Sequence, residues 1–319
     1  MSPLTLLLAP LSLLFSFVVR ARRLCYRLGL CKSTRVGLPV IVVGNLTAGG
    51  SGKTPLVLWI TQSLADAGWR PGIVSRGYGG RLSAAGAPPV EVAEASDPLE
   101  VGDEPLLLAR RSRCPVWVGA DRVAACVALQ KRHPECDVLV LDDGLQHYAL
   151  ARDVEVVVVD ARGFGNGLLF PAGPLREPVS RLASVDAVVS HGSAEKGFAM
   201  SLAGTGFVRL ADPGGAPQPN ALKGPVHAVA GIGDPARFFR HLESLGLEVK
   251  PHPFPDHHPF SPAELEFGDG LPVVMTEKDA VKCLRFAKPD FWMLPVRAEV
   301  DPAFGALLAD KLRGKSRGP

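Results

Sequence analysis

The stretch that most constrains this chain is VGNLTAGGSGKTPL, residues 43–56, which ends as a phosphate-binding loop ends. The usual spacing of such loops, G-x-x-x-x-G-K-[ST], is met at Gly52, Lys53 and Thr54, whereas Thr47 stands where the first glycine is expected. A threonine is tolerated there if the backbone does not need a positive φ angle. The stretch therefore predicts a nucleotide site built on a glycine-rich turn.

The segments around this loop have the pattern that the motif requires. Residues 39–45, PVIVVGN, are a short β-branched run that predicts a buried strand, and residues 54–68 have the apolar spacing of a helix that stops at a glycine. Backbone N–H groups of the loop would then converge on phosphate oxygens at the helix N-terminus. The alternative is a glycine-rich turn that only joins strand to helix. The order strand, loop, helix favours the nucleotide site.

Further apolar runs are spaced along the chain, with helical stretches between several of them. These strand-like runs are residues 72–75, 115–119, 137–143, 154–160 and 185–190. Strands that alternate with helices are typical of a mostly parallel, doubly wound sheet, which binds ligands beyond the carboxyl ends of its strands. The predicted fold class is α/β: a P-loop NTPase-type sheet, a second and smaller α/β domain, and an N-terminal membrane-associated helix.

The expected division of the chain follows from changes in composition. We expect a membrane-associated apolar and basic helix over residues 1–35 and a P-loop core over residues 36–203. Residues 204–224 are rich in Gly, Pro and Ala and weak in periodicity, which predicts a linker. A smaller α/β domain over residues 225–319 would complete a cleft between the two domains, a natural place for an active site.

The overall composition argues against several classes of protein. The chain of 319 residues is 47% hydrophobic and 21% charged, which is the balance of an ordinary globular protein. A net charge of +3 without a dense basic tract argues against a nucleic-acid partner. The 6 cysteines are scattered without a C-x-x-C pair, as expected of reduced thiols rather than of disulfides or a zinc site.

The N-terminal segment differs from the rest of the chain. Residues 3–19 carry no charge, and arginines and lysines follow them up to Arg35. A secretory signal would place its charge before the apolar run, so this order argues against one. The run is at the lower limit of length for a membrane span and contains Pro3 and Pro10. We expect a helix lying in the membrane surface with its basic flank at anionic head groups, rather than a span or a core helix.

The loop supplies the expected nucleotide-binding residues. They are Thr47, Ala48, Gly49, Gly50, Ser51, Gly52, Lys53 and Thr54. In such a loop the lysine pairs with the β- and γ-phosphates, which makes Lys53 a candidate catalytic residue. The hydroxyl of Thr54 would ligate Mg²⁺.

Two acidic stretches are candidate parts of the site, as ligands of a metal or otherwise. Asp142 and Asp143 end a hydrophobic strand, where a carboxylate can hold the Mg²⁺ of a P-loop enzyme, although Asp-Asp-Gly is also common at solvated turns. The upstream loop favours the metal role. Asp103 and Glu104 precede a predicted helix. Glu104 is a further candidate metal ligand, and Asp103 could equally cap the helix.

Several polar residues in connecting loops are candidates for binding a substrate. Arg76 follows a strand end, and Arg176 and Glu177 end a Gly/Pro-rich loop, where an arginine can position an anionic group. Gln146 and His147 follow the aspartate pair. Each of these residues could instead belong to an ordinary surface connection.

A histidine pair lies between prolines in the second domain, in FPDHHP. His257 and His258 are adjacent, and neighbouring side chains cannot both face one way on a strand. We therefore expect one functional histidine, and a zinc pair lacks further ligands.

Taken in order, 7 motifs of the chain resemble those of one family, the tetraacyldisaccharide 4′-kinases, which are the lipid A 4′-kinases of Gram-negative bacteria. They are GNLTAGGSGKTP, SRGYGG, VGDEP, DDGLQH, GPLREP, FPDHH and TEKDAVK. Thr47 is usual in this family, so it is no departure from the family pattern. The resemblance runs from the apolar segment to about residue 285.

The resemblance implies a complete activity. It implies ATP-dependent phosphorylation of the 4′-hydroxyl of an acylated glucosamine disaccharide, the tetraacyl 1-phosphate precursor of lipid A. It implies ATP and Mg²⁺ as cofactors and a place at the cytoplasmic face of the inner membrane, and it points to no known protein partner. It further implies that Asp103 is the general base and that His257, next to Asp256, assists it.

Two other functions share the loop. A regulatory P-loop ATPase of the deviant class carries a lysine directly before the Gly-Gly, where this chain has Ala48. A GTPase needs N-K-x-D to bind guanine, and TEKD at residues 276–279 has the wrong spacing. The membrane-associated regulatory ATPase is the alternative to the kinase, and ATP turnover that needs a lipid acceptor distinguishes the two.

Overall fold

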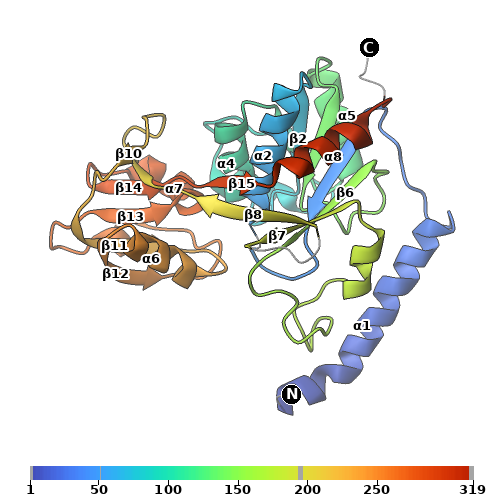
Figure 1. Cartoon of the computed structure of the whole chain (residues 1–319), viewed down its shortest axis with the longest axis horizontal. Helices are drawn as coiled ribbons and strands as arrows, with labels where there is room; N and C mark the ends of the chain where they lie inside the picture. Colours follow the sequence, from blue (N-terminus) through green and yellow to red (C-terminus); the bar gives the residue numbers. More distant parts are fainter. Residues whose placement is uncertain (1–2, 51, 193–196, 316–319) are drawn as a thin grey trace.

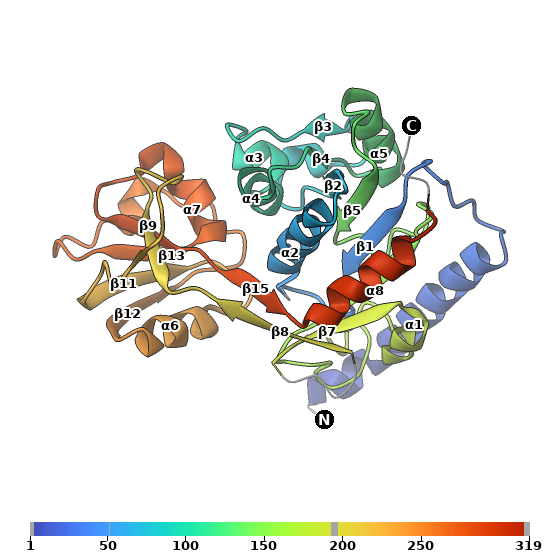
Figure 2. The ribbon, with the colours of Figure 1, turned by 45° about the horizontal axis from the view of Figure 1, so that its top comes forward.

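The computed structural model describes residues 3–50, 52–192 and 197–315. Two α/β parts lie next to each other and are joined by a pair of adjacent strands, and one helix projects from the larger part (Figures 1 and 2). This arrangement agrees with the predicted α/β class with a second, smaller domain.

The larger sheet is built mostly from parallel strands. Its strands are β1 Val40–Gly44, β2 Pro71–Ser75, β3 Val90–Glu91, β4 Val116–Val118, β5 Val138–Asp142, β6 Val154–Val159, β7 Ala187–His191, β8 Phe198–Ala203 and β15 Arg297–Val300. Their order is β15-β8-β7-β6-β1-β5-β2-β4-β3. The strands from β8 to β4 run parallel, and β15 and β3 add antiparallel edges. The predicted parallel sheet is confirmed.

Helices cover both faces of this sheet. They are α2 Lys53–Asp66, α3 Pro98–Val101, α4 Asp103–Ser112, α5 Arg122–Arg132 and α8 Pro302–Leu312. Side chains alternate along a strand, so Ile41 and Val43 of β1 pack with α2, α4 and α8, whereas Val40 and Val42 pack with α5. Burial on both faces explains why the central strands read as continuous apolar runs.

The smaller sheet has helices on its opposite faces. Its strands are β9 Gly206–Arg209, β10 Gln218–Pro219, β11 Gly224–Ala230, β12 Leu247–Pro253, β13 Val273–Thr276 and β14 Phe291–Leu294, in the order β10-β9-β14-β13-β11-β12. One face packs against α6, Pro235–Ser244, and the other against α7, Glu277–Cys283. Short 3₁₀ helices lie at Arg81–Ser83, Val179–Ser184, Pro262–Leu265 and Leu284–Phe286.

The structure departs from the expected domain boundaries in two places. Residues 204–224, expected as a linker, contain β9 and β10, which extend the smaller sheet. Residues 225–319, expected as one domain, include β15 and α8, which belong to the larger part: β15 pairs with β8, and Phe304 of α8 stacks on Trp59 of α2 at 5.6 Å. The chain leaves the larger sheet through β8 and returns through β15, a long-range pairing that local periodicity cannot show.

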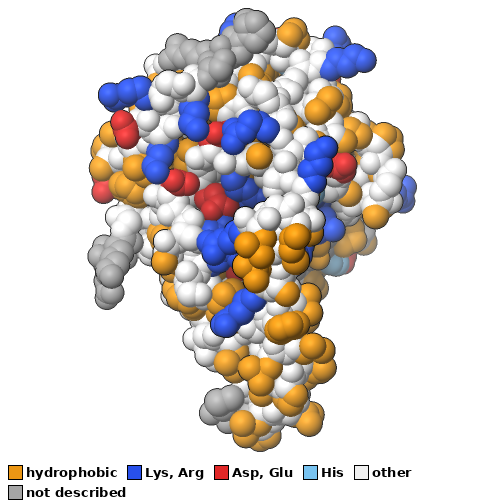
Figure 3. Space-filling model, turned by 90° about the vertical axis from the view of Figure 1, so that its right-hand side faces the viewer, with side chains coloured by type: hydrophobic (Ala, Val, Ile, Leu, Met, Phe, Trp, Pro, Cys, Tyr) orange, Lys and Arg blue, Asp and Glu red, His pale blue; other side chains and the backbone are white. Residues whose placement is uncertain are grey.

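The N-terminal segment forms helix α1, Pro3–Arg27. Among the residues that the structure describes, this is the one helix long and apolar enough to cross a membrane, with a mean hydropathy of 1.5. Ser12 Oγ donates to Leu169 O at 2.7 Å, and the Phe15 ring meets Phe170 edge-on. Only 6% of its apolar window is buried, and Figure 3 shows an apolar projection below a group of Lys and Arg side chains. This exposure argues against a core helix.

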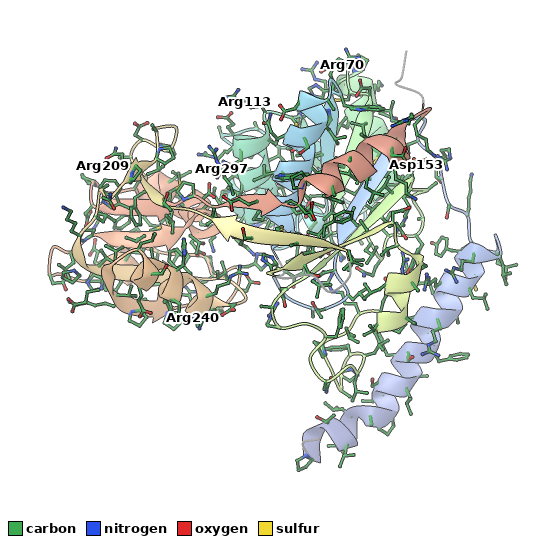
Figure 4. The ribbon with its side chains drawn as sticks, viewed as in Figure 1. Arg70, Arg113, Asp153, Arg209, Arg240 and Arg297 are labelled. Atoms are coloured by element: carbon green, nitrogen blue, oxygen red, sulfur yellow. The ribbon has the colours of Figure 1, made fainter. Side chains whose placement is uncertain are left out.

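Asp153 attaches two remote segments to the start of β6 (Figure 4). Its carboxylate accepts from Val40 N, Arg35 Nη1 and Lys315 Nζ, each at 3.0 Å. Burial raises the pKa of Asp153, but these three donors outweigh it and hold the pKa below its ordinary value. Because Arg35 follows α1 and Lys315 follows α8, one carboxylate holds the segments that follow these two helices.

Candidate active site

The phosphate-binding loop joins β1 to α2 and is shaped by the loop that contains GPLREP. Thr47 forms an antiparallel bridge with Leu175 and is not among the residues with positive φ, so it needs no glycine. Ala48 N donates to Pro174 O at 2.8 Å. The Ala48 N–H is therefore engaged by protein, and this part of the loop holds its shape rather than presenting a donor to phosphate.

The second half of the loop is tightly surrounded. Gly52 has a φ of 75°, and a Cβ added there would stand 2.4 Å from His191 Nε2, so glycine is required. Gly50 lies against the smaller part, since a Cβ on Gly233 would be 3.1 Å from Gly50 N. Gly49 also has a positive φ, of 94°. Ser51, expected to bind nucleotide, lies outside the described residues.

Lys53 begins α2 and points to the acidic turn after β5. Its ammonium lies 3.2 Å from Asn45 Oδ1 and 3.5 Å from Asp143 Oδ1. Arg176 Nη1 donates to Asp143 at 3.1 Å. Burial raises the pKa of Asp143, but Lys53 and Arg176 outweigh it and lower the pKa below its ordinary value. Asp143 therefore holds two cations beside the phosphate-binding loop.

Asp142, at the end of β5, is an almost fully buried carboxylate. Ser75 Oγ is 3.5 Å from its Oδ2, and its Oδ1 has no hydrogen-bond partner among the described residues. Burial, followed by the charge of Glu104, raises the pKa of Asp142 to about 7. A buried acceptor of this kind needs a partner, and a cation would satisfy it.

The structure brings Asp103 and His257 together although they come from different parts of the fold. His257 Nδ1 lies 3.0 and 3.1 Å from the two carboxylate oxygens of Asp103. Asp103 is 4% exposed, whereas His257 is 21% exposed and packs on the ring of Tyr78. In the sequence, only the family resemblance related these two residues, because 154 positions separate them.

Each member of this pair shifts the pKa of the other. Burial raises the pKa of Asp103, but the hydrogen bond from His257 and the charges of Lys278 and Lys282 bring it below its ordinary value. Burial lowers the pKa of His257, but the hydrogen bond and charge of Asp103 bring it above its ordinary value. The capping alternative for Asp103 does not apply, because Gly102 is the N-cap of α4 and Asp103 Oδ1 accepts from the adjacent Glu104 N.

Charged pairs join α4 of the larger part to α7 of the smaller part beside this dyad. Lys278 Nζ is 3.0 Å from Glu104 Oε1, and Arg111 pairs with Glu277. Lys282 Nζ is 3.9 Å from Asp103 Oδ2. The sequence singled out TEKDAVK as a motif but assigned no role to Lys278. A role for Lys278 becomes apparent only because α4 and α7 face each other in the fold.

A cavity of about 280 Å³ lies between the two parts. Its polar lining residues include Lys53, Thr54, Glu104 and Lys278, and its apolar lining residues include Leu58, Leu107, Ile232, Phe238, Leu294 and Val296. Polar groups beside the glycine-rich loop suit phosphates, and the apolar residues suit a nucleoside base. A cavity of about 40 Å³ beside Asp103 and His257 opens near Lys282 and Arg285.

The remaining expected residues fall into three groups. Arg76 is exposed beyond the end of β2. Gln146 Nε2 donates to Asn45 O at 3.2 Å, and His147 is enclosed, so that burial, with the charge of Arg122, lowers its pKa to about 4. Gln146 therefore supports Asn45, which contacts Lys53.

Glu177, expected to bind substrate, faces away from the cleft. It is 1% exposed, accepts from Tyr148 Oη at 2.7 Å and pairs with Arg181 at 3.2 Å. Its place is structural, in a buried network that reaches α1 where Arg23 Nη2 donates to Ser184 Oγ.

Arg122, which the sequence did not single out, lies among the candidate residues. It is 7% exposed at the start of α5, and its Nε has no hydrogen-bond partner among the described residues. Burial and the charge of Arg76 lower its pKa to about 10, while Asp142 and Asp143 oppose this shift. An arginine in the first turn of a helix is unremarkable in sequence, so no local signal could have identified it.

Comparisons with known proteins identify the family of this chain. The family described as LpxK, tetraacyldisaccharide-1-P 4′-kinase, matches residues 4–313. A tetraacyldisaccharide 4′-kinase of Azoarcus sp. (strain BH72) is 52% identical over 98% of this chain and 93% of its own length. That of Alkalilimnicola ehrlichii is 55% identical over 93% of this chain and 89% of its own.

A solved structure supports the fold over nearly all of this chain. LpxK from Aquifex aeolicus, crystallised in complex with ATP, is similar with a TM-score of 0.80 and 28% identity, covering 97% of this chain and 99% of that one. The family match and the structural similarity both span nearly all of the sequence. As its motifs predict, the chain belongs to the tetraacyldisaccharide-1-P 4′-kinase family.

Proposed function

We propose that this chain transfers the γ-phosphate of ATP to the 4′-hydroxyl of a tetraacyl glucosamine disaccharide 1-phosphate. Family membership supports the reaction, and the ATP bound to the Aquifex relative supports the nucleotide. One observation carries the proposal: Lys278 lines the cavity that contains Lys53 and also contacts His257. Lys278 therefore connects the cavity at the phosphate-binding loop with the proposed proton acceptor, which supports direct phosphoryl transfer.

We propose Mg²⁺ as the second cofactor, held by Asp142, Thr54 and Glu104. The buried, unpartnered Oδ1 of Asp142 and an all-oxygen donor set fit a hard cation. No group of three or more histidine, cysteine and carboxylate side chains in the described parts of the chain is arranged to ligate a metal. This fits Mg²⁺, which is usually held by one or two carboxylates with substrate phosphates. When bound, the ion would neutralise charge on the phosphates.

Besides the metal ion, the positive charge of Lys53 would act on the transferring phosphoryl group. Lys53, held at 3.5 Å from Asp143, is placed to stabilise the charge that develops on the transferring phosphoryl group. Asp143 keeps Lys53 and Arg176 oriented, which supports a positioning role for Asp143 rather than direct metal ligation. Gly49, Gly50 and Gly52 would let the backbone approach the phosphates at the start of α2.

Burial and pKa favour His257 as the proton acceptor, with Asp103 orienting it. A base works best when its pKa lies near the working pH; the pKa of His257 is raised towards that range, whereas the pKa of Asp103 is lowered away from it. His257 is also the more exposed of the two. Its Nε2 would take the proton of the 4′-hydroxyl while that oxygen bonds to the γ-phosphorus and ADP leaves. This reverses the roles that the family resemblance implies for the pair.

The acceptor is a lipid, and α1 is placed to meet its membrane. We propose that α1 lies in the cytoplasmic face of the inner membrane, with its basic C-terminal part at the head groups. Arg76 and the buried Arg122 are close enough for each charge to affect the other, and Arg122 Nε has no protein partner among the described residues. We assign them to an anionic group of the acceptor.

Incubation with labelled ATP, Mg²⁺ and the tetraacyl disaccharide 1-phosphate tests this proposal. We expect label in the lipid fraction after chromatography, and none when the acceptor lacks the 4′-hydroxyl. ATP hydrolysis that proceeds at the same rate without any lipid, with no labelled lipid formed, would contradict the kinase and favour the regulatory ATPase.

A further inference from the structure

Lys278 occupies a position that the proposed reaction does not yet explain. Its ammonium is 3.0 Å from Glu104 Oε1, 3.0 Å from Asp256 Oδ1 and 3.3 Å from His257 Nε2. Its side chain is only 13% exposed. An ammonium has three N–H donors and no acceptor, so these three contacts account for all of its donors.

The contact with His257 determines the protonation of the imidazole. Because Lys278 can only donate, Nε2 has to be the acceptor, and the single ring proton is then on Nδ1, where it is donated to Asp103. Other neighbours of the ring include Tyr78, which packs on its face, and Asp256, 3.8 Å from Nε2. Lys278 is thus the one described cation in contact with the atom that would receive the substrate proton.

This contact and the proton transfer exclude each other. Once Nε2 takes a proton, the imidazolium and the ammonium would be two positive charges 3.3 Å apart, with no donor–acceptor pair between them. The ammonium must therefore leave Nε2 before or during the reaction. The side chain of Lys278 lines the same cavity as Lys53 and Thr54, so the terminal phosphate of a bound nucleotide is an anion within that cavity that can attract it.

We infer that Lys278 is a positioning residue that covers Nε2 of His257 and releases it when the terminal phosphate of a nucleoside triphosphate draws the ammonium away. The inference rests on the proposed function. It makes the proton acceptor available only when the phosphoryl donor is in place. Lys278 then links the two halves of the reaction, although it belongs to neither the phosphate-binding loop nor the dyad.

The test follows His257 by ¹⁵N NMR in the full-length, ¹⁵N-histidine-labelled protein in detergent micelles, with MgCl₂ in every sample. His257→Gln assigns the signal. In the native protein, adenylyl-imidodiphosphate should raise the pKa of His257, because a cation leaves Nε2. In Lys278→Met the pKa should already be higher without the nucleotide, and most of the nucleotide-dependent rise should be lost. With substrates, kcat should fall roughly 10- to 150-fold, because the variant loses the charged hydrogen bond that the ammonium would make to the terminal phosphate.

Lys282→Met is the matched control, since Lys282 lies on the same helix, is similarly buried and is 3.9 Å from Asp103. It should keep the full nucleotide-dependent rise. Melting curves confirm that the variants fold, and Lys278→Gln provides a second variant if the methionine does not. An equal rise in native and Lys278 variants, with the analogue bound in both, would overturn the inference alone. Failure of the native protein to bind the analogue in calorimetry would overturn the proposed function and the inference with it.

Discussion

A double-mutant cycle on Asp103 and His257 tests which of the two residues is the base and which one orients the other. The carboxylate reaches Nδ1 with both oxygens, at 3.0 and 3.1 Å. A hydrogen bond that involves a charged group contributes about 1.5–3 kcal/mol, so Asp103→Ala should lower kcat roughly 10- to 150-fold if it acts only through His257. Loss of the base itself is larger, about 10²–10⁴-fold, and should be seen in His257→Ala.

The double variant decides between the two assignments. If His257 is the base, removing Asp103 from His257→Ala should change kcat little further, so the double variant should match the histidine variant. If Asp103 is the base, the double variant should match Asp103→Ala, which would then be the more damaged single variant. Steady-state kcat with lipid and ATP near saturation is the measurement. Strictly multiplicative losses, or a folded and fully active Asp103→Ala protein, would refute the dyad.

The smaller part of the fold contains a matched control pair. His227 Nε2 lies 2.9 and 3.1 Å from the two carboxylate oxygens of Asp269, nearly the same geometry as in the dyad, and neither residue lines a cavity described here. Asp269→Ala and His227→Ala should lower thermal stability with kcat close to native. A comparable loss of kcat in these variants would show that the cycle measures folding rather than proton transfer.

Four further changes have distinct expected outcomes. Lys53→Ala should lower kcat by several orders of magnitude with the fold retained by circular dichroism, since a charge aimed at the transferring group is lost. Deleting residues 1–19 should raise the KM for lipid more than that for ATP and weaken vesicle binding. Asp142 has a raised pKa, of about 7, so the native state binds more protons than the unfolded state, and stability should fall as pH rises from about 4 to about 7. In melting curves without Mg²⁺ at pH 8, Asp142→Asn should therefore melt at a higher temperature than the native protein. Phe304→Ala should cost about 3–5 kcal/mol in urea unfolding, because that ring packs on Trp59.

Local sequence patterns were sufficient for the phosphate-binding half of the site. The run ending at Gly44, the glycine-rich turn and the helix from Lys53 are contiguous, so strand, loop and helix could be predicted from neighbouring residues alone. The aspartates after β5 were also predictable in place, because a buried strand ends there. Their separate roles could not be predicted: Asp143 holds Lys53 and Arg176, whereas Asp142 is buried and one of its oxygens has no partner among the described residues.

The proton-acceptor half of the site depends on contacts between residues far apart in the sequence, which no local pattern predicts. Arg111 and Glu277 form an ion pair across 166 positions, and Lys278 reaches Glu104 across 174. Glu177 shows the converse, since its motif suggested a substrate contact but tertiary packing buries it against Tyr148. Charged residues in loops look alike in sequence, and only the meeting of two domains assigns some of them to a site and others to the interior.

The way the two sheets meet explains why the site lies where it does. In the larger sheet, the phosphate-binding loop, Arg122 and Asp142 stand at or just beyond the carboxyl ends of β1, β4 and β5. In the smaller sheet, Gly233, His257 and Lys278 follow the ends of the parallel strands β11, β12 and β13. Parallel sheets bind ligands at this edge, and here two such edges face one cavity. The proposed nucleotide site and the proposed proton acceptor therefore belong to different sheets, and the described chain passes between the two sheets through β8 and β15.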